Sequence, residues 1–225
     1  MGAAASPRRR PARARLLEVA DRLFYEEGVH AVGIDRVLEQ SGVAKGSLYY
    51  NFGSKDDLVR TYLQNRHARW AARIDTELAA ATTPADKILA IFDALADLFA
   101  QPGFRGCAFI NAAAEAPAGS AEELAAKAFR IWLHELFATL LAEAGYRDAG
   151  KLTVQLVLLY DGANISAQMD HNPAAAEAAR DAAASLLRSS TGCEVDPVGR
   201  LASADERHRH HLRREQAVGD EPGRR

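Results

Sequence analysis

Apolar residues along this chain recur every three or four positions, and no segment alternates β-branched and polar residues as a strand does. From residue 11 to 27, Leu16, Leu23 and Phe24 fall on one helical face, and Gly28 supplies a stop signal. The pattern therefore predicts an all-α protein that begins with an amphipathic helix.

Two short helices are predicted next, over residues 33–40 and 44–51, and the tight turn between them contains Gly42. Glycine suits such a turn because it adopts a positive φ angle without steric cost. After this pair, Ser54 is a suitable N-cap for a long helix that begins at Lys55. The expected buried stripe of this long helix consists of Leu58, Tyr62, Trp70, Ile74 and Leu78.

The remaining chain continues the helical pattern up to about residue 187. Pro84 fits a first helical turn, and Ser120 with Glu123 forms a capping-box pair. The further predicted helices span residues 84–99, 106–115, 121–144, 152–169 and 173–187. Beyond them, glycine, proline and charges of both signs occur without periodicity, which is typical of disorder.

A short helix, a tight turn and a second short helix form a helix-turn-helix, whose second helix enters the DNA major groove. Val37, Val43 and Leu48 can hold the pair against the first helix, which leaves polar groups on the outer face. Glycine within the second helix costs about 1 kcal/mol of helix stability, but it lets the backbone approach a groove wall. Ammonium and hydroxyl groups can donate to phosphates and base edges. The predicted DNA contacts are Lys45, Gly46, Ser47, Tyr49, Tyr50, Asn51 and Lys55.

Charge and composition narrow the class of protein. The net charge is only −2, yet the first fifteen residues hold five arginines and no acidic residue. This arm, Arg8 to Arg15, suits phosphate or the minor groove, although a solvated tail explains it equally well. The most apolar segment, residues 152–169, is interrupted by polar side chains, so we expect no membrane span. With only Cys107 and Cys193, far apart, neither a disulfide scaffold nor a zinc finger is predicted, and the cytoplasm is the expected location.

Residues 32–58, VGIDRVLEQSGVAKGSLYYNFGSKDDL, resemble the DNA-binding signature of TetR/AcrR-type transcriptional regulators. The preceding helix is similar to the first helix of the same family, so the resemblance covers about residues 13–63. Gly33 stands where the family often has a threonine cap, and we include it among the DNA-binding residues. Leu38 and Asn51 also depart from the pattern. The matching positions are Gly42, Val43, Gly46, Leu48, Tyr49, Phe52, Ser54, Lys55 and Leu58.

The resemblance implies a homodimer that binds double-stranded DNA and is regulated by a small molecule. It implies dimer contacts from the last two helices, a ligand pocket in the C-terminal domain, and a repressor more than an activator. No cofactor, catalytic residue or metal site is expected, and the small-molecule inducer is unidentified. The expected parts are a disordered basic arm at 1–11, a helix-turn-helix domain at 12–58, a helical ligand-binding and dimerisation domain at 59–188, and a disordered tail at 189–225.

Several apolar and amide side chains of the second domain are candidates for the ligand pocket, although core packing explains most of them equally well. Cys107 is either a redox-sensing thiol or a small buried residue. His208, His210 and His211 in the tail fit either a solvated tail or metal ligands, and the solvated tail is the preferred interpretation. The pocket candidates are Phe99, Phe104, Cys107, Asn111, Phe129, Trp132, Leu133, Phe137, Tyr160 and Asn164.

Two other classes of protein compete with the regulator hypothesis. The first is a helical enzyme or small-molecule binding protein that merely contains a helix-turn-helix, and the second is an interaction adaptor with a basic arm. An enzyme should show a nucleophile, an acid–base pair or a metal set, and Glu115, His134, Asp161 and His171 form no recognisable spacing.

Overall fold

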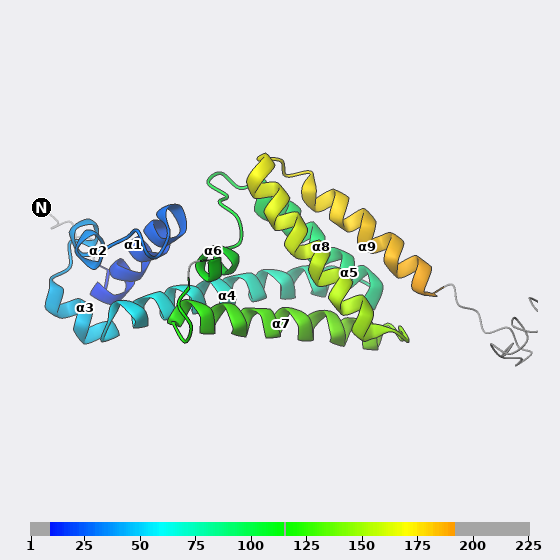
Figure 1. The fold of residues 1–225 in the computed structure, drawn as a ribbon, viewed down its shortest axis with the longest axis horizontal. Helices are drawn as coiled ribbons and strands as arrows, with labels where there is room; N and C mark the ends of the chain where they lie inside the picture. The colour runs from blue at the N-terminus through cyan, green and yellow to red at the C-terminus, as the bar shows by residue number, and fades with distance from the viewer. Residues whose placement is uncertain (1–9, 115, 192–225) are drawn as a thin grey trace, which may run out of the picture. The chain divides into compact units, whose positions relative to one another are not determined.

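The computed structural model describes residues 10–114 and 116–191, and the regular structure in these residues is entirely α-helical (Figure 1). The all-α class predicted from the periodicity is confirmed. Residues 1–9 of the predicted arm and residues 192–225 of the predicted tail, with Cys193 and the tail histidines, lie outside the described residues. The helices are α1 (Ala12–Glu27), α2 (Ile34–Ser41), α3 (Lys45–Phe52), α4 (Lys55–Ala80), α5 (Pro84–Phe99), α6 (Ala108–Ala114), α7 (Ala121–Glu143), α8 (Ala149–Asp170) and α9 (Ala175–Thr191).

Most helix boundaries agree with the predicted ones to within two residues, and the larger differences are the start of α8, three residues earlier than predicted, and the end of α9, four residues later. Helix α6 begins two residues later than predicted because Gly106 adopts a φ of 84°, which is incompatible with a right-handed helix. Helix α9 begins at Ala175 and continues to Thr191, so residues 189–191 belong to the helix rather than to the predicted tail. In this last turn, the hydroxyls of Ser189 and Ser190 donate to the carbonyl of Leu186.

Helices α1, α2 and α3 form a compact cluster at one end of Figure 1. Short helices are unstable alone, so their apolar residues must pack against a partner. Val37 of α2 and Leu48 of α3 are fully buried, as are Leu16 and Leu23 of α1. The predicted packing of the two short helices on the first helix is thus confirmed.

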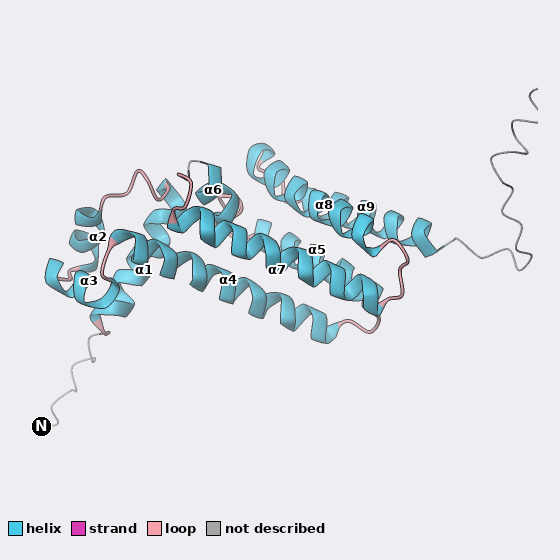
Figure 2. Ribbon diagram, turned by 60° about the horizontal axis from the view of Figure 1, so that its bottom comes forward, coloured by secondary structure: helices cyan, strands magenta, loops and turns pink. Residues whose placement is uncertain are grey.

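Helix α4 links this cluster to the other helices (Figure 2). Near its beginning, Tyr62 contacts the Phe24 ring of α1 with ring centroids 5.5 Å apart. Farther along, Ile74 is fully buried where α4 packs against α5 and α7. One continuous helix therefore contacts both the helix-turn-helix and the C-terminal helices.

The C-terminal helices pack together, with α8 between α7 and α9, and α5 in contact with α7 and α9. Helix α4 packs against α5 and α7 of this group. Phe92 of α5 and Phe137 of α7 are buried in their core, with ring centroids 6.1 Å apart. Within the described residues, no helix combines the length and the hydropathy that crossing a bilayer requires.

Candidate nucleic-acid interface and adjoining cavity

The turn between α2 and α3 has the conformation predicted for Gly42, with φ 58° and ψ 35° in the left-handed region. Its N–H donates to the carbonyl of Glu39 at 3.3 Å, and Val43 N–H donates to Leu38 at 3.4 Å. From α1, Arg15 Nη1 donates to the carbonyl oxygens of Ser41 at 2.9 Å and Gly42 at 3.3 Å. A guanidinium at the end of α2 is favourable because the helix dipole is negative there. The turn is therefore held by α1 as well as by its own backbone.

The outer face of α3 is open to solvent. Tyr50 is 90% exposed and Tyr49 is 47% exposed, whereas the preceding residue, Leu48, is fully buried. Lys45 and Gly46 are exposed, and a Cβ atom added to Gly46 would meet no atom within 4 Å. The surface of a binding partner can therefore approach the backbone of α3 at Gly46 without displacing protein atoms.

Other predicted DNA-contacting residues already have partners in the protein. The Asn51 side-chain amide donates to the Ser47 carbonyl at 2.7 Å, and Lys45 Nζ lies 3.5 Å from the carboxylate of Asp35. Gly33 is exposed at the N-cap of α2 and has no side chain to cap that helix. DNA contact by these residues stays a prediction.

Lys55 has a structural contact that sequence reasoning missed. Its Nζ donates to the carbonyl of Val29 at 2.8 Å, so it ties the start of α4 to the connection between α1 and α2. An ammonium at a helix N-terminus opposes the helix dipole, and this hydrogen bond offsets part of that cost. The role of Lys55 in binding phosphate also stays a prediction.

The described arginines of the basic arm contact the protein. Arg10 pairs with Glu18 at 3.0 Å, and the Arg13 guanidinium lies 5.0 Å from the centroid of the Phe52 ring. Both side chains stay exposed, and Arg13 lies beside α3, whereas Arg15 is used in the turn described above. Only Arg10 and Arg13 are therefore available to DNA among the described arginines of this arm.

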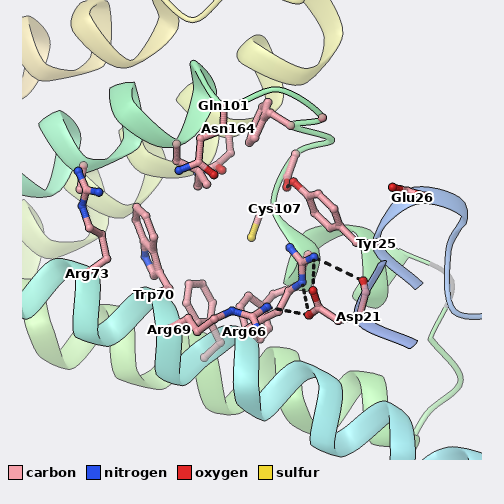
Figure 3. Close-up of a pocket in the computed structure, with 18 of the residues that line it drawn as sticks. Asp21, Tyr25, Glu26, Arg66, Arg69, Trp70, Arg73, Gln101, Cys107 and Asn164 are labelled. Atoms are coloured by element: carbon pink, nitrogen blue, oxygen red, sulfur yellow. Dashed lines mark hydrogen bonds and ion pairs between the residues drawn. The ribbon is translucent and has the colours of Figure 1, made fainter. Parts of the chain in front are cut away.

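A cavity of about 670 Å³ lies next to the helix-turn-helix (Figure 3). Residues of α1, α4, α5, α6, α7, α8 and the 101–107 segment contribute to its lining. Much of the lining is aromatic, a composition typical of pockets for organic molecules. The aromatic residues of the C-terminal helices and of the 101–107 segment are Trp70, Phe104, Phe109, Phe129 and Tyr160.

Charged residues line the side of the cavity nearest α1. Asp21 of α1 accepts from Arg66 of α4, with Oδ1 3.1 Å from Nε and Oδ2 3.2 Å from Nη2. The same Oδ1 accepts from Arg69 Nη2 at 2.7 Å. Figure 3 shows both arginines directed at Asp21, with Trp70 and Arg73 farther along α4. We call Asp21, Arg66 and Arg69 the ion triad.

Tyr25 connects α1 to the opposite side of the cavity. Its hydroxyl donates to the Gly106 carbonyl at 2.9 Å and accepts from the Arg105 N–H at 3.0 Å. The Arg66 guanidinium stacks on the Tyr25 ring, 3.7 Å from its centroid. Through Asp21 and Tyr25, α1, the first helix of the helix-turn-helix domain, thus forms part of the cavity wall.

The buried titratable groups of the cavity are neutral. Burial raises the pKa of the Cys107 thiol above its ordinary value, and it also raises the pKa of the Tyr160 phenol. Asn164, only 1% exposed, donates from its amide to the Tyr160 carbonyl at 2.9 Å. The charges that face the cavity therefore come from α1 and α4.

Comparison with known proteins now decides the family. Residues 16–62 match the family model described as bacterial regulatory proteins, tetR family. The structure is similar to that of SCO4454, a TetR-family transcriptional regulator from Streptomyces coelicolor, with a TM-score of 0.75. The two sequences are 35% identical, and the similarity covers 80% of this chain and 96% of that chain. The chain belongs to the TetR family.

Curated relatives match only part of the chain. The HTH-type transcriptional repressor KstR2 of Mycolicibacterium smegmatis is 30% identical over 80 residues, which are 36% of this chain and 39% of that protein. The HTH-type transcriptional activator FasR of the same organism is 31% identical over 85 residues, 38% of this chain and 39% of that protein. The chain thus matches less than half the length of these relatives. It is a TetR-family transcription regulator with a DNA-binding helix-turn-helix rather than an enzyme.

In this TetR-family chain, the residues predicted for a ligand pocket divide into two groups. Phe104, Cys107, Phe129, Tyr160 and Asn164 line the cavity. The others lie elsewhere, and they are Phe99, Asn111, Trp132, Leu133 and Phe137.

The second group has identifiable packing roles. Phe99 is buried behind Phe104, with ring centroids 4.8 Å apart, and Leu133 and Phe137 are fully buried in the core. The Trp132 ring packs against His67, and the exposed amide of Asn111 donates to the Arg105 carbonyl at 2.8 Å. Helical spacing places an aromatic residue on a buried face, but it does not distinguish a core from a cavity wall.

Sequence reasoning missed the charged side of the cavity. Arg66, Arg69 and Arg73 follow one another at spacings of three and four, so they share a face of the predicted long helix. In the sequence, this row of arginines is the signal that could have predicted the charged side of the cavity. Asp21 and Tyr25 offered no comparable signal because they meet α4 and the 101–107 segment only in the folded chain.

Proposed function

We propose that this TetR-family protein is a ligand-responsive repressor that acts in the cytoplasm. In this proposal it binds a palindromic operator as a homodimer through α3, and a small molecule in the cavity releases it from DNA. The observation that carries the proposal is the exposed face of α3 around Gly46, where tyrosine hydroxyls and an ammonium group surround an open stretch of backbone.

DNA binding by α3 is supported by the chemistry of that face. Hydroxyl and ammonium donors satisfy phosphate oxygens, and lysine also bonds the edge of guanine. Tyr50 is almost fully solvated, so its ring buries little apolar surface in the monomer. A partner surface with many acceptors would explain its presence.

Homodimerisation is supported by one face of α8. Val154, Leu158, Ile165 and Met169 recur at helical spacing and are exposed, with Leu158 62% and Met169 74% accessible. Exposed apolar stripes of this kind mark protein interfaces, and a second copy of the same stripe fits a two-fold contact. Two recognition helices can then meet successive major grooves about 34 to 36 Å apart.

Release by a ligand is supported by the position of the cavity. Its wall includes α1 of the helix-turn-helix and the long α4, so a ligand there contacts both regions. A ligand shifts a conformational equilibrium only by its differential affinity for the two states. A molecule that favours a different placement of α1 on α4 would change the spacing of the recognition helices.

Fluorescence anisotropy with duplex DNA from the promoter next to the protein's own gene tests the proposal. Lys45→Ala and Tyr49→Ala should each weaken binding at least about tenfold, because each removes a DNA contact. Lys127→Ala, which removes an exposed lysine from α7, is the matched control and should bind normally. Circular dichroism checks that each variant is folded.

Unchanged affinity in both α3 variants would contradict the assignment of α3 as the DNA contact. If wild-type protein ignored this duplex and random DNA alike in dilute salt, the adaptor hypothesis would be favoured instead. Expression of a reporter from the same promoter, with and without the protein, decides between repression and activation.

A further inference from the structure

The lining of the cavity carries more positive than negative charge. Arg22, Arg66, Arg69 and Arg73 line it, against the carboxylates Asp21 and Glu26. Arg22 pairs with Glu26 at 3.6 Å, and Arg73 pairs with Glu77 and Asp97, neither of which lines the cavity. The excess is therefore located in the ion triad, where two guanidiniums share the single carboxylate of Asp21.

The two arginines of the ion triad are used differently. Arg66 is 20% exposed, donates two hydrogen bonds to the Asp21 carboxylate and stacks on Tyr25. Arg69 is 58% exposed and donates through one nitrogen only, to the Asp21 carboxylate that Arg66 also uses. Since a guanidinium carries five N–H donors, Arg69 can accept a further anion.

Aromatic surface lies next to these donors. Trp70 follows Arg69 directly on α4, and Phe104, Phe109, Phe129 and Tyr160 complete the apolar lining. A ligand that fills this space needs an apolar, planar body, and one that satisfies Arg69 needs an acidic group at its edge.

On the proposed function of ligand-controlled DNA binding, we propose that the cavity binds aromatic carboxylic acids. The carboxylate bonds Arg69 and competes with Asp21 for the guanidiniums of the ion triad. Asp21 belongs to α1, so a ligand that takes its place loosens the attachment of the helix-turn-helix to α4. Ligand occupancy and the position of α1 are coupled through this one shared carboxylate site.

Isothermal titration calorimetry of the full chain with 2-naphthoate and 2-naphthamide tests the ligand class. The two probes share a ring system and differ in charge. A charge-assisted bond to a guanidinium adds enough free energy for naphthoate to bind about tenfold more tightly than naphthamide. Equal affinities, or no binding of either probe at millimolar concentration, would overturn the proposal.

Arg69→Gln tests the anchoring residue. It should weaken naphthoate binding by about tenfold and leave naphthamide binding unchanged. Arg69 is the better choice than Arg66, because its side chain is 58% exposed and donates to Asp21 through a single nitrogen, so its loss should not unfold the chain. Arg147→Gln removes the same charge from the exposed α7–α8 connection and should change neither affinity. Naphthoate binding that is insensitive to Arg69→Gln would contradict the assignment.

Asp21→Asn tests the competition. Without the carboxylate, naphthoate should bind several-fold more tightly, while naphthamide should not. Glu26→Gln is the matched control, because Glu26 is the other lining carboxylate on α1 and does not contact Arg66 or Arg69. If both variants gained the same affinity for naphthoate, the cause would be the loss of a negative charge near the cavity in general. That result would contradict competition at the ion triad.

Cys107 provides a readout of location. It lines the cavity, and in a Cys193→Ser background it is the only remaining thiol. Because burial raises the pKa of Cys107, maleimide labelling is best followed at pH 8.5. Naphthoate should slow labelling at least about tenfold when the site is saturated, and unchanged labelling would exclude this cavity as the binding site.

Failure of this inference is distinguishable from failure of the proposed function. If the protein binds promoter DNA but has equal affinities for naphthoate and naphthamide, the proposed ligand class is wrong and the proposed DNA-binding function stands. Naphthoate binding that obeys the variants, with no DNA binding in dilute salt, removes the proposed operator function. If naphthoate binds as expected but leaves DNA affinity unchanged, the coupling through Asp21 is wrong.

Discussion

His67 of α4 lies among the edges and faces of three aromatic rings. Its ring centroid is 4.9 Å from Trp132, 5.4 Å from Phe129 and 6.1 Å from Phe109. Burial in this setting lowers the pKa of His67, because the charged imidazolium loses hydration that the rings do not replace. The neutral form is therefore the one that the fold favours.

This shift predicts a loss of stability in mild acid. As the pH falls below the unfolded-state pKa of about 6.5, the unfolded chain binds the proton first, so the free energy of unfolding decreases until the lower folded-state pKa is passed. His67→Gln should reduce the difference between the free energies of unfolding at pH 8 and pH 5.5, measured with urea. His134→Gln on α7 serves as the control for loss of a histidine. An identical pH difference in wild type and His67→Gln would contradict this account.

At the scale of the element, the turn between α2 and α3 decides where the recognition helix points. Gly42 adopts a left-handed conformation, and the carbonyls around it accept from Arg15. Because α3 is only eight residues long, its orientation depends on this turn and on the burial of Leu48 and Phe52.

Gly42→Ala should lower the free energy of unfolding by about 1 to 2 kcal/mol, because a Cβ atom is unfavourable in the left-handed region. Gly42→Asn should cost less, since asparagine tolerates this conformation. Urea denaturation followed by circular dichroism measures both, and DNA binding should weaken in parallel. Equal stability of wild type and Gly42→Ala would show that the turn relaxes without cost.

At the scale of the whole molecule, the exposed stripe of α8 stands out among the C-terminal helices. Helix α8 is buried against α7 and α9 on its other faces, as expected for its nearly continuous apolar sequence. Its sequence, apolar from Leu152 to Leu159 and followed by the small Gly162 and Ala163, indicates a helix buried on several sides, in a deep core or a dimer seam. The proposed homodimer would bury these exposed side chains.

Leu158→Glu should convert the dimer to a monomer, because two carboxylates would face each other across a two-fold contact. Leu124→Glu on α7 is the matched control, since Leu124 is also a large exposed apolar residue. Light scattering after size-exclusion chromatography measures the mass, and anisotropy measures operator affinity. A Leu158→Glu protein that keeps the mass of the wild type would place the interface elsewhere.

The sequence by itself determined the helices and the helix-turn-helix. Periodicity, caps such as Ser54 and the turn glycine Gly42 act over a few residues, so their signal is local and can be read without the fold. Ser54 Oγ accepts from the Asp57 N–H at 3.0 Å, as its spacing predicts. The exposure of Gly46 follows equally from its place opposite the buried Leu48, two residues further along the helix.

Only the tertiary structure decided which side chains meet across the chain. Asp21 bonds Arg66, forty-five residues away, and Lys55 bonds the carbonyl of Val29. Local spacing assigns a side chain to a face of its helix, but the partner of that face depends on how distant helices pack. For the same reason Phe104 lines a cavity while Phe99, its packing neighbour, lies behind it in the core.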